Sequence, residues 1–253
     1  MESSKNPLVC FFDSGIGGIG LLYECVHRLP RVDFIYFADN FRVPYGNLNK
    51  EEILKYTVEI FDEINKLNPA AAVIACNTVT AHCIEYLRKK YPFKIIGVQP
   101  AVKPAAACGK CIVLATEATA KSDSLNNLVK DYGKGVTEVF ACRGLADYIE
   151  QNIFSLSESE IIKFLPVADT QGVVLGCTHY AFAGEIIEKY YKCPVFDGIK
   201  GTADNLIAKL GISDHCTVRA HKIMFSGGDC AKNRAVFNML LKKRGSFSQN
   251  SGN

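Results

Sequence analysis

The chain has 253 residues, of which 48% are hydrophobic, and its formal net charge is +3. This length can bury one large core or two smaller ones, and a small net charge without a clustered basic stripe argues against nucleic acid as the main partner. The polar amino terminus leads into a short apolar run, which predicts neither a signal peptide nor a membrane span and indicates a cytoplasmic protein. In that reducing compartment, the eleven cysteines are expected as thiols rather than as a disulfide framework.

Short apolar runs alternate with helical stretches along the chain, and this alternation predicts an α/β fold with a largely parallel sheet. The runs are brief, apolar throughout and partly β-branched, as buried strands of parallel sheets are. In chain order, the expected strands are residues 8–12, 34–37, 70–75, 95–98, 112–115, 136–141, 173–175 and 223–225.

A glycine-rich segment, Gly15 to Gly20, follows the first expected strand. Its spacing fits a dinucleotide-binding loop, and Asp39 ends the next strand about twenty residues later, so a nicotinamide-dependent oxidoreductase is an alternative. However, Asp13 and Ser14 stand before the first glycine, and a carboxylate there would repel a pyrophosphate. The same carboxylate could instead accept a hydrogen bond from a substrate ammonium or help a nearby thiol to lose its proton.

Two helix starts carry the residues of a capping box. Apolar residues at helical spacing predict a helix over residues 49–67, with the side chains of Asn49 and Glu52 bonding each other's backbone N–H groups. Ser157 and Glu160 form the same signal ahead of a second helix.

Two cysteines stand at the carboxyl ends of expected strands. Cys76 and Cys177 each follow an apolar run and precede small hydroxyl or amide residues. Ligands of open α/β sheets bind at the carboxyl ends of strands, so both thiols are candidate site residues. His179 could act as the acid-base partner of Cys177, and Asp13 could serve Cys76.

Two thiols facing one substrate suit proton transfer at a carbon centre from opposite faces. One thiolate removes the proton and the other group, as a neutral thiol, returns a proton on the far side, which inverts the stereocentre. A free thiol has a pKa of about 8.5, so the thiolate needs neighbouring donors, a helix start or an acid-base partner. Short donors such as Ser14, Asn77, Thr78 and Thr178 could satisfy the carboxylates of an anionic substrate.

The order of these features repeats weakly along the chain. Asp13 and Cys76 follow two strands of the first half, and Thr116 to Thr119 and Cys177 follow two strands of the second. The sequence therefore predicts two similar open-sheet α/β domains in a pseudo-twofold arrangement, with the active site in the cleft between them.

A domain boundary is expected near Gln99-Pro100, because proline disfavours helix in the residue before it. The first domain would comprise residues 1–98 plus about 207–242, and the second residues 99–206. A last helix is expected around residues 232–243. The segment 243–253, which is rich in Ser, Asn and Gly, predicts a disordered tail.

Cys108 and Cys111 form a Cys-x-x-Cys pair that suggests a metal or redox protein. A structural zinc site needs about four ligands, and no second such pair occurs. A relative that binds its ligand without turnover is a further alternative.

Four ordered motifs then resemble the glutamate racemase family over nearly the whole chain. Asp13 lies in Phe-Asp-Ser-Gly-Ile-Gly-Gly, Pro44 in Val-Pro-Tyr-Gly, Cys76 in Ala-Cys-Asn-Thr and Cys177 in Gly-Cys-Thr-His-Tyr. The resemblance implies a racemase without cofactor or metal that supplies D-glutamate for peptidoglycan. It also implies D- and L-glutamate as substrates and a homodimer. From charge and hydropathy we expect no nucleic-acid or membrane partner.

The resemblance also implies roles for individual residues. Cys76 would deprotonate D-glutamate and Cys177 L-glutamate, supported by Asp13, Glu150 and His179. The implied substrate contacts are Asp13, Ser14, Pro44, Tyr45, Gly46, Asn77, Thr78, Thr116, Thr119, Thr178 and His179. Ala115, Arg143 and Ala181 stand where the family commonly has glycine, proline and proline, which leaves room for a related substrate such as aspartate.

Overall fold

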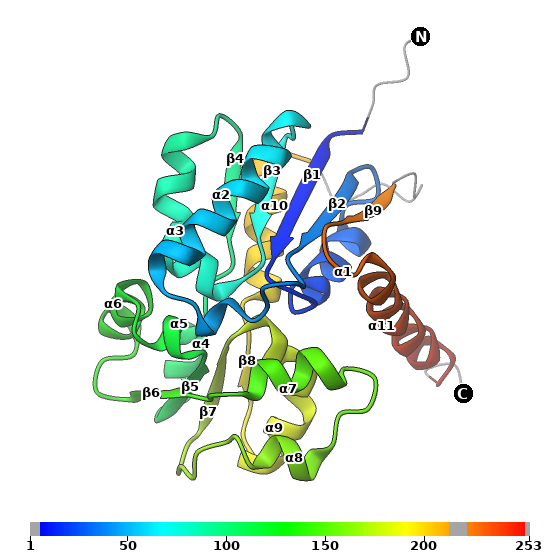
Figure 1. The fold of residues 1–253 in the computed structure, drawn as a ribbon. Coiled ribbons are helices and arrows are strands. Elements are labelled where there is room, and N and C mark those ends of the chain that lie inside the picture. The colour runs from blue at the N-terminus through cyan, green and yellow to red at the C-terminus, as the bar shows by residue number, and fades with distance from the viewer. Residues whose placement is uncertain (1–5, 213–221, 251–253) are drawn as a thin grey trace.

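The structure is a computed structural model that describes residues 6–212 and 222–250, with side chains up to residue 243. It contains two parallel sheets, one above the other in Figure 1. In the five-stranded sheet the order is β4 (Lys94–Gly97), β3 (Ala71–Ile74), β1 (Leu8–Asp13), β2 (Asp33–Ala38) and β9 (Ile223–Ser226). In the four-stranded sheet the order is β6 (Thr137–Ala141), β5 (Cys111–Ala115), β7 (Gly172–Gly176) and β8 (Val195–Phe196).

The two sheets share one strand order, so the predicted similarity of the two halves is confirmed. In each sheet the first strand, β1 or β5, has the next strand on one side and the third and fourth strands on the other. All eight expected strands are present within one or two residues at each end. The two-residue strand β8 was not expected, because two half-buried residues carry no periodic pattern.

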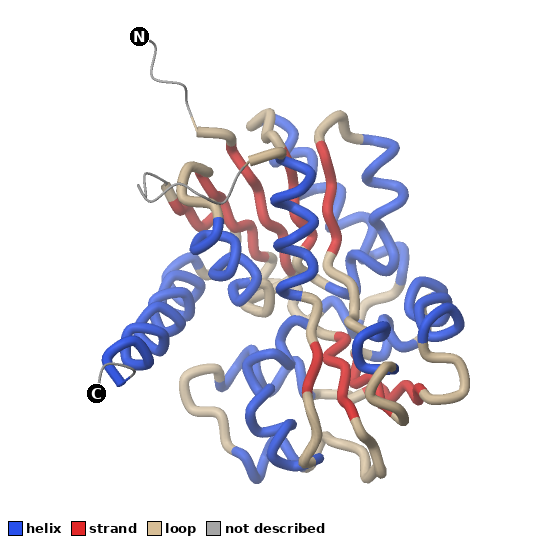
Figure 2. Tube along the Cα trace, turned by 180° about the vertical axis from the view of Figure 1, so that it is seen from behind, coloured by secondary structure: helices blue, strands red, loops and turns tan. Residues whose placement is uncertain are grey.

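Helices cover both sheets, as Figure 2 shows from behind. The α-helices are α1 (Ile19–Arg28), α2 (Lys50–Lys66), α3 (Asn77–Lys90), α4 (Val102–Ala106), α5 (Glu117–Ala120), α6 (Asp123–Tyr132), α7 (Leu145–Asn152), α8 (Glu158–Ile162), α9 (Gly184–Tyr191), α10 (Ile199–Leu210) and α11 (Cys230–Asn250). Two short 3-10 helices are η1 (Tyr45–Asn47) and η2 (Thr178–Ala183). No helix in the described ranges is both long and apolar enough to cross a membrane.

The two predicted capping boxes have different outcomes. At α2 the box is confirmed: Asn49 Oδ1 accepts from Glu52 N at 2.9 Å, and Glu52 Oε2 accepts from Asn49 N at 3.1 Å. At α8 the helix begins after Ser157 as expected, but the box is wrong. The Ser157 hydroxyl bonds the Ser159 hydroxyl, while the Glu160 carboxylate pairs with Lys163, so neither side chain caps the helix.

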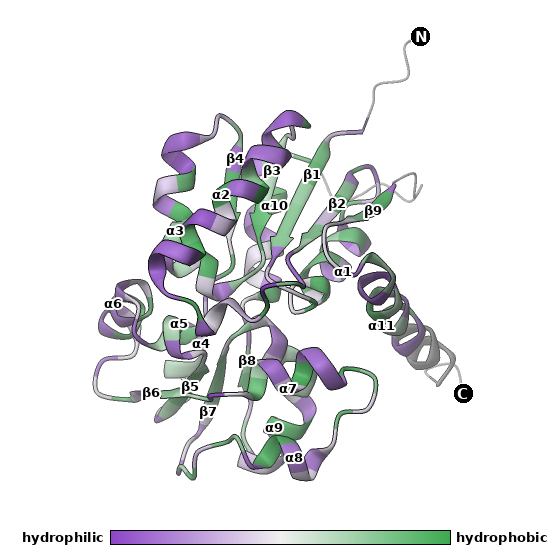
Figure 3. Ribbon diagram, in the orientation of Figure 1, coloured by the Kyte–Doolittle hydropathy of each residue, from purple (hydrophilic) through white to green (hydrophobic). Residues whose placement is uncertain are grey.

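Alternate residues of β1 show how the core is divided. Cys10 and Phe12 face a cluster beneath α2 and α3, while Val9 and Phe11 face a second cluster with α1. The second cluster continues into the four-stranded sheet through residues such as Ile112, so one apolar core joins the two halves. Figure 3 shows the strands as mainly hydrophobic and the outer helical faces as mainly hydrophilic.

The predicted domain boundaries, 1–98 plus about 207–242 and 99–206, fall between the strands of the two sheets and stay a prediction. Helix α10 packs against α1 and β4 of the five-stranded sheet. Helix α11 continues through residues 243–250, where the sequence predicts a disordered tail, and residues 251–253 lie outside the described part of the chain.

Candidate active site

The candidate residues lie where the strand order reverses in each sheet. In the five-stranded sheet, Asp13 ends β1 and Cys76 follows the adjacent β3. In the four-stranded sheet, Thr116 follows β5 and Cys177 follows the adjacent β7. Such reversal points of open α/β sheets are the usual ligand sites, because the flanking loops diverge there.

Hydrogen bonds join the two halves at this point. Thr178 Oγ1 donates to Asp13 Oδ2 at 3.1 Å, and the backbone N–H of Ile16 donates to Glu150 Oε2 at 3.0 Å. Cys76 and Cys177 are only 6% and 7% exposed, and Asp13 is fully buried. These three side chains are therefore almost wholly buried at the junction of the halves.

Cys177 lies beside a hydrogen-bonded acid-base pair. Its Sγ is 3.9 Å from His179 Nδ1, and His179 Nε2 is 2.6 Å from Glu150 Oε2. Burial disfavours the imidazolium, but the bonds to Cys177 and Glu150 outweigh it and raise the pKa of His179 well above its usual value. The structure thus places a hydrogen-bonded imidazole and carboxylate pair beside the Cys177 thiol.

Glu150 is an anion held by several donors. Burial opposes its ionisation, yet hydrogen bonds from His179, the Ile16 N–H and Lys232 lower the pKa of Glu150 to about 2. Its Oε1 atom accepts from Lys232 Nζ at 3.0 Å and from Asn40 Nδ2 at 3.2 Å.

Cys76 has different neighbours. Its Sγ is 3.8 Å from Ser14 Oγ, which in turn lies 3.3 Å from Asp13 Oδ1. Burial and the negative charge of Asp13 raise the pKa of the Cys76 thiol. Burial also raises the pKa of Asp13, a shift opposed by the charge of His179 and by hydrogen bonds from Gly15 and Thr178.

Three threonine hydroxyls meet between the halves. Thr78 Oγ1 lies 3.1 Å from both Thr116 Oγ1 and Thr119 Oγ1, and the last two are also 3.1 Å apart. Beside them, Asn77 is 5% exposed and its Oδ1 has no hydrogen-bond partner. A buried acceptor without a partner costs free energy, so Asn77 is poised to receive a ligand donor.

Pro44, Tyr45 and Gly46 are consecutive in the chain, but each contacts a different part of the molecule. The Tyr45 hydroxyl donates to Asp39 Oδ2 at 2.6 Å. Gly46 packs so closely on Thr116 that a Cβ atom there would clash with the threonine side chain. Pro44 lines a pocket of about 290 Å³ together with Glu150, Lys232 and other residues.

The glycine-rich segment packs against the site rather than opening a cradle. A Cβ atom at Gly17 would collide with Thr178 and lie 2.7 Å from His179 Nδ1, and one at Gly18 would collide with Ala75. Close packing thus accounts for these glycines: Gly17 contacts the other half of the molecule, and Gly18 contacts the neighbouring strand end of its own half.

Three contacts of the site were missed from the sequence. Lys232 and Asn40 bond Glu150, and the Tyr36 hydroxyl donates to the Gly15 carbonyl oxygen at 2.7 Å. Lys232 is 82 residues from Glu150 in the chain, so local spacing holds no signal for the pair.

The Cys108 and Cys111 pair does not form a shared site. Cys108 is exposed, whereas Cys111 is buried with its Sγ 3.1 Å from Thr137 Oγ1. Among the described residues, no group of three or more His, Cys, Asp or Glu side chains could hold a metal ion.

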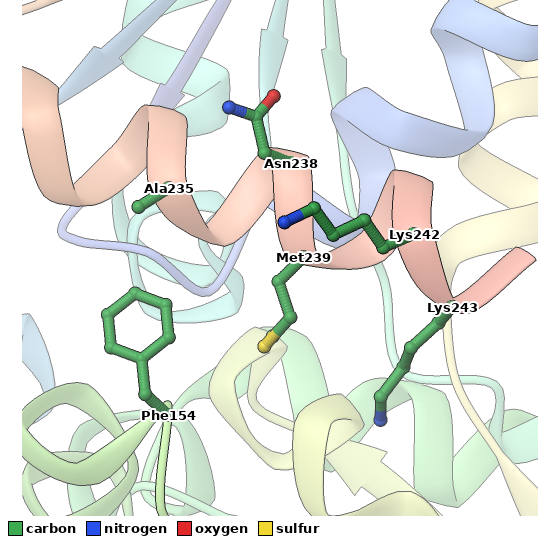
Figure 4. A pocket seen from close by; sticks show the side chains of 6 residues that line it. All are labelled: Phe154, Ala235, Asn238, Met239, Lys242 and Lys243. Carbon is green, nitrogen blue, oxygen red and sulfur yellow. The ribbon is translucent and has the colours of Figure 1, made fainter. Parts of the chain in front are cut away.

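A pocket of about 630 Å³ lies along α11 and is lined by Phe154, Ala235, Asn238, Met239, Lys242 and Lys243. Figure 4 shows these side chains. None of these is a candidate site residue.

Comparison with known proteins gives a consistent result. The family model for Asp/Glu/hydantoin racemases matches residues 24–206. Glutamate racemase 2 of Bacillus subtilis is 39% identical over 213 residues, covering 78% of this chain and 79% of the relative. The glutamate racemase of Clostridium novyi is 40% identical over 223 residues, covering 83% of this chain and 85% of the relative.

Solved structures share the fold. Escherichia coli glutamate racemase, solved with L-glutamate and the activator UDP-MurNAc-Ala, has a TM-score of 0.80 at 26% identity, covering 94% of this chain and 95% of that one. An allantoin racemase from Klebsiella pneumoniae has a TM-score of 0.52 at 16% identity, covering 89% of this chain and 98% of that one, a likeness of fold alone.

Proposed function

The chain belongs to the Asp/Glu/hydantoin racemase family, and from this premise we propose that it interconverts L-glutamate and D-glutamate by a two-thiol, cofactor-independent mechanism. The observation that carries the proposal is the matched placement of Cys76 and Cys177. Each follows the third strand of its sheet, beside hydrogen-bonded acid-base groups, and both lie at the junction of the halves.

In the direction from L-glutamate, the Cys177 thiolate removes the α-proton. The C–H bond breaks, an S–H bond forms, and the electron pair delocalises into the α-carboxylate. The Cys76 thiol then gives its proton to the opposite face, so its S–H bond breaks as the new C–H bond forms. From D-glutamate the roles exchange.

The protonation states expected for this start are supported on both sides. His179 Nδ1 lies 3.9 Å from Cys177 Sγ, within reach of its thiol proton, whereas burial and the charge of Asp13 raise the pKa of the Cys76 thiol. After one turnover the states are reversed, so the protons must exchange with solvent or a second substrate must arrive in the D form.

Groups at the site suit a dicarboxylic amino acid. The hydroxyls of Thr78, Thr116 and Thr119 can donate to a carboxylate, and the Asn77 Oδ1 acceptor suits the ammonium. Backbone N–H groups at the start of α3 add partial positive charge for the anionic intermediate.

The biological setting follows from the same resemblance. We expect the product D-glutamate to serve peptidoglycan synthesis, the protein to act in the cytoplasm, and its chains to form a homodimer. Size measurement in solution by light scattering tests the last expectation.

Proton NMR in heavy water tests the function directly. The purified, reduced and chelator-treated protein is mixed separately with each glutamate enantiomer and no added cofactor. We expect the α-proton signal of both enantiomers to disappear and the optical rotation to decay to zero. The same measurement is made with aspartate. If aspartate alone lost its α-proton, the proposed substrate would be wrong but the mechanism would stand. If neither amino acid reacted, the result would support the alternative that the protein binds its ligand without turnover.

A further inference from the structure

Lys232, at the start of α11, forms two hydrogen bonds to Glu150, and the Glu150 carboxylate in turn bonds His179. Its Nζ donates to the Glu150 backbone oxygen at 2.6 Å and to Glu150 Oε1 at 3.0 Å. We propose that Lys232 is a positioning residue for the Cys177 half of the site, acting by fixing the Glu150 carboxylate against His179. The contribution of Lys232 to catalysis rests on the proposed function.

The donors around Glu150 define one orientation of its carboxylate. Oε2 accepts from His179 and from the Ile16 N–H, and Oε1 accepts from Lys232 and Asn40. Because Lys232 bonds both the main chain and the side chain of Glu150, rotation of the carboxylate would break that bridge. The clamp therefore restricts the torsions that aim Oε2 at His179.

The first turn of α11 is itself anchored beside Glu150. Asn40 Oδ1 accepts from the Asp229 N–H at 3.1 Å and from Asn233 Nδ2 at 3.0 Å, while Asp229 Oδ1 accepts from the Lys232 N–H at 2.9 Å. Lys232 thus approaches from a fixed backbone, and its side chain is 25% exposed against 6% for Glu150.

The charges that line the pocket of about 290 Å³ beside Pro44 also support a positioning role for Lys232. Asp147, Glu150 and Asp229 line it, and Lys232 is the one cation among the described residues that line this pocket. Without Lys232, no lysine or arginine among these residues would offset the three carboxylates, and their repulsion would favour other orientations of Glu150.

The effect should be larger at one thiol than at the other. Cys177 connects to Lys232 through His179 and Glu150, whereas the side-chain hydrogen bonds of Cys76 lead to Ser14 and Asp13. The enantiomers have equal free energies in water, so kcat/KM must be equal in both directions for every variant. A defect at one thiol must therefore be sought in single-thiol proteins.

The kinetic test places Lys232→Met in two backgrounds. In Cys76→Ser we expect α-proton removal from L-glutamate to fall about tenfold, a common loss for a group that orients an acid-base residue. In Cys177→Ser we expect α-proton removal from D-glutamate to change much less. Lys232→Arg should restore part of the loss, and Lys189→Met, which removes an exposed ion pair on α9, is the matched control. Equal losses in both backgrounds would overturn the proposal.

A spectroscopic test is independent of turnover. The short bond between His179 Nε2 and Glu150 should give a downfield imidazole proton resonance, assigned by its loss in His179→Gln. We expect this resonance to move upfield or vanish in Lys232→Met and to persist in Lys232→Arg and Lys189→Met. An unchanged resonance in Lys232→Met would refute the positioning. If the unaltered protein turned over neither enantiomer, the proposed function would fail, and this resonance alone would decide whether Lys232 positions Glu150.

Discussion

The two thiols occupy equivalent places in the two sheets but have unlike surroundings. Cys177 touches His179, which is backed by Glu150 and Lys232, whereas Cys76 lies against Ser14 and the carboxylate of Asp13. Equivalent backbone positions thus carry a cation on one side and an anion on the other. The comparison teaches that a repeated fold can place two like groups symmetrically while their neighbours give them different electrostatic surroundings.

The largest effect is expected when either thiol is removed, because the difference between the two sides then decides which enantiomer still loses its α-proton. We expect Cys76→Ser and Cys177→Ser each to lower kcat/KM for racemisation by at least about 10³-fold, because a hydroxyl is a far weaker acid than a thiol. NMR in heavy water should still show α-proton loss from L-glutamate in Cys76→Ser and from D-glutamate in Cys177→Ser. Cys193→Ser, half-buried outside the site, is the control. Wild-type racemisation by either site variant would contradict the two-base assignment.

Removing the charge of Glu150 should make the surroundings of Cys177 more like those of Cys76, because His179 then has less reason to carry a positive charge. In Glu150→Gln, His179 loses its anionic partner, and the pKa of His179 should fall towards its ordinary value. We expect α-proton removal from L-glutamate, measured in the Cys76→Ser background, to fall about 100-fold. Glu117→Gln, which removes an exposed ion-paired carboxylate on α5, should leave this rate unchanged. A normal rate in Glu150→Gln would mean that His179 needs no anionic support.

A smaller effect is expected when the hydroxyl beside Cys76 is removed. Ser14 Oγ is within 3.8 Å of Cys76 Sγ, and a hydrogen bond to a thiolate there stabilises its charge. We expect Ser14→Ala to slow α-proton removal from D-glutamate in the Cys177→Ser background about tenfold, as loss of one bond to a charged group does. An equal loss for L-glutamate in the Cys76→Ser background would count against a role specific to Cys76. The exposed Ser159→Ala serves as control.

The smallest expected effect concerns acid stability. The pKa of Glu150 is lowered from 4.5 to about 2 in the folded protein, so the unfolded chain takes up this proton first as the pH falls. Stability from Glu150 is therefore complete above about pH 4.5 and is lost as the pH falls towards about 2. Urea unfolding across this window should show a steeper loss for the wild type than for Glu150→Gln. Parallel curves would mean that the Glu150 proton is not linked to folding.

Much of the fold could be predicted because its strands are short apolar runs with few alternatives. The runs at residues 8–12 and 70–75, for example, become β1 and β3 within one or two residues at each end. Ser157 and Glu160 show the limit of the method. Their residue types permit a capping box, but nearby Ser159 and Lys163 compete for the same side chains.

The site could be predicted in part for a similar reason. Asp13, Cys76 and Cys177 follow strands directly, so the sheet places them without long loops. Glu150 could be identified only by family resemblance, because it lies inside α7, where nothing local marks its partners. Lys232 reaches it through the packing of α11, which no local pattern encodes.

The closed junction of the two halves has a consequence for speed. The bonds from Thr178 to Asp13 and from Ile16 to Glu150 are made by the groups that surround the thiols, and these groups are almost wholly buried. If ligand entry requires these bonds to open, a catalytic cycle of the proposed reaction includes one opening for entry and one for release. The rate of this breathing motion, on a timescale of roughly microseconds to milliseconds, is then a ceiling on turnover that faster proton transfer could not raise.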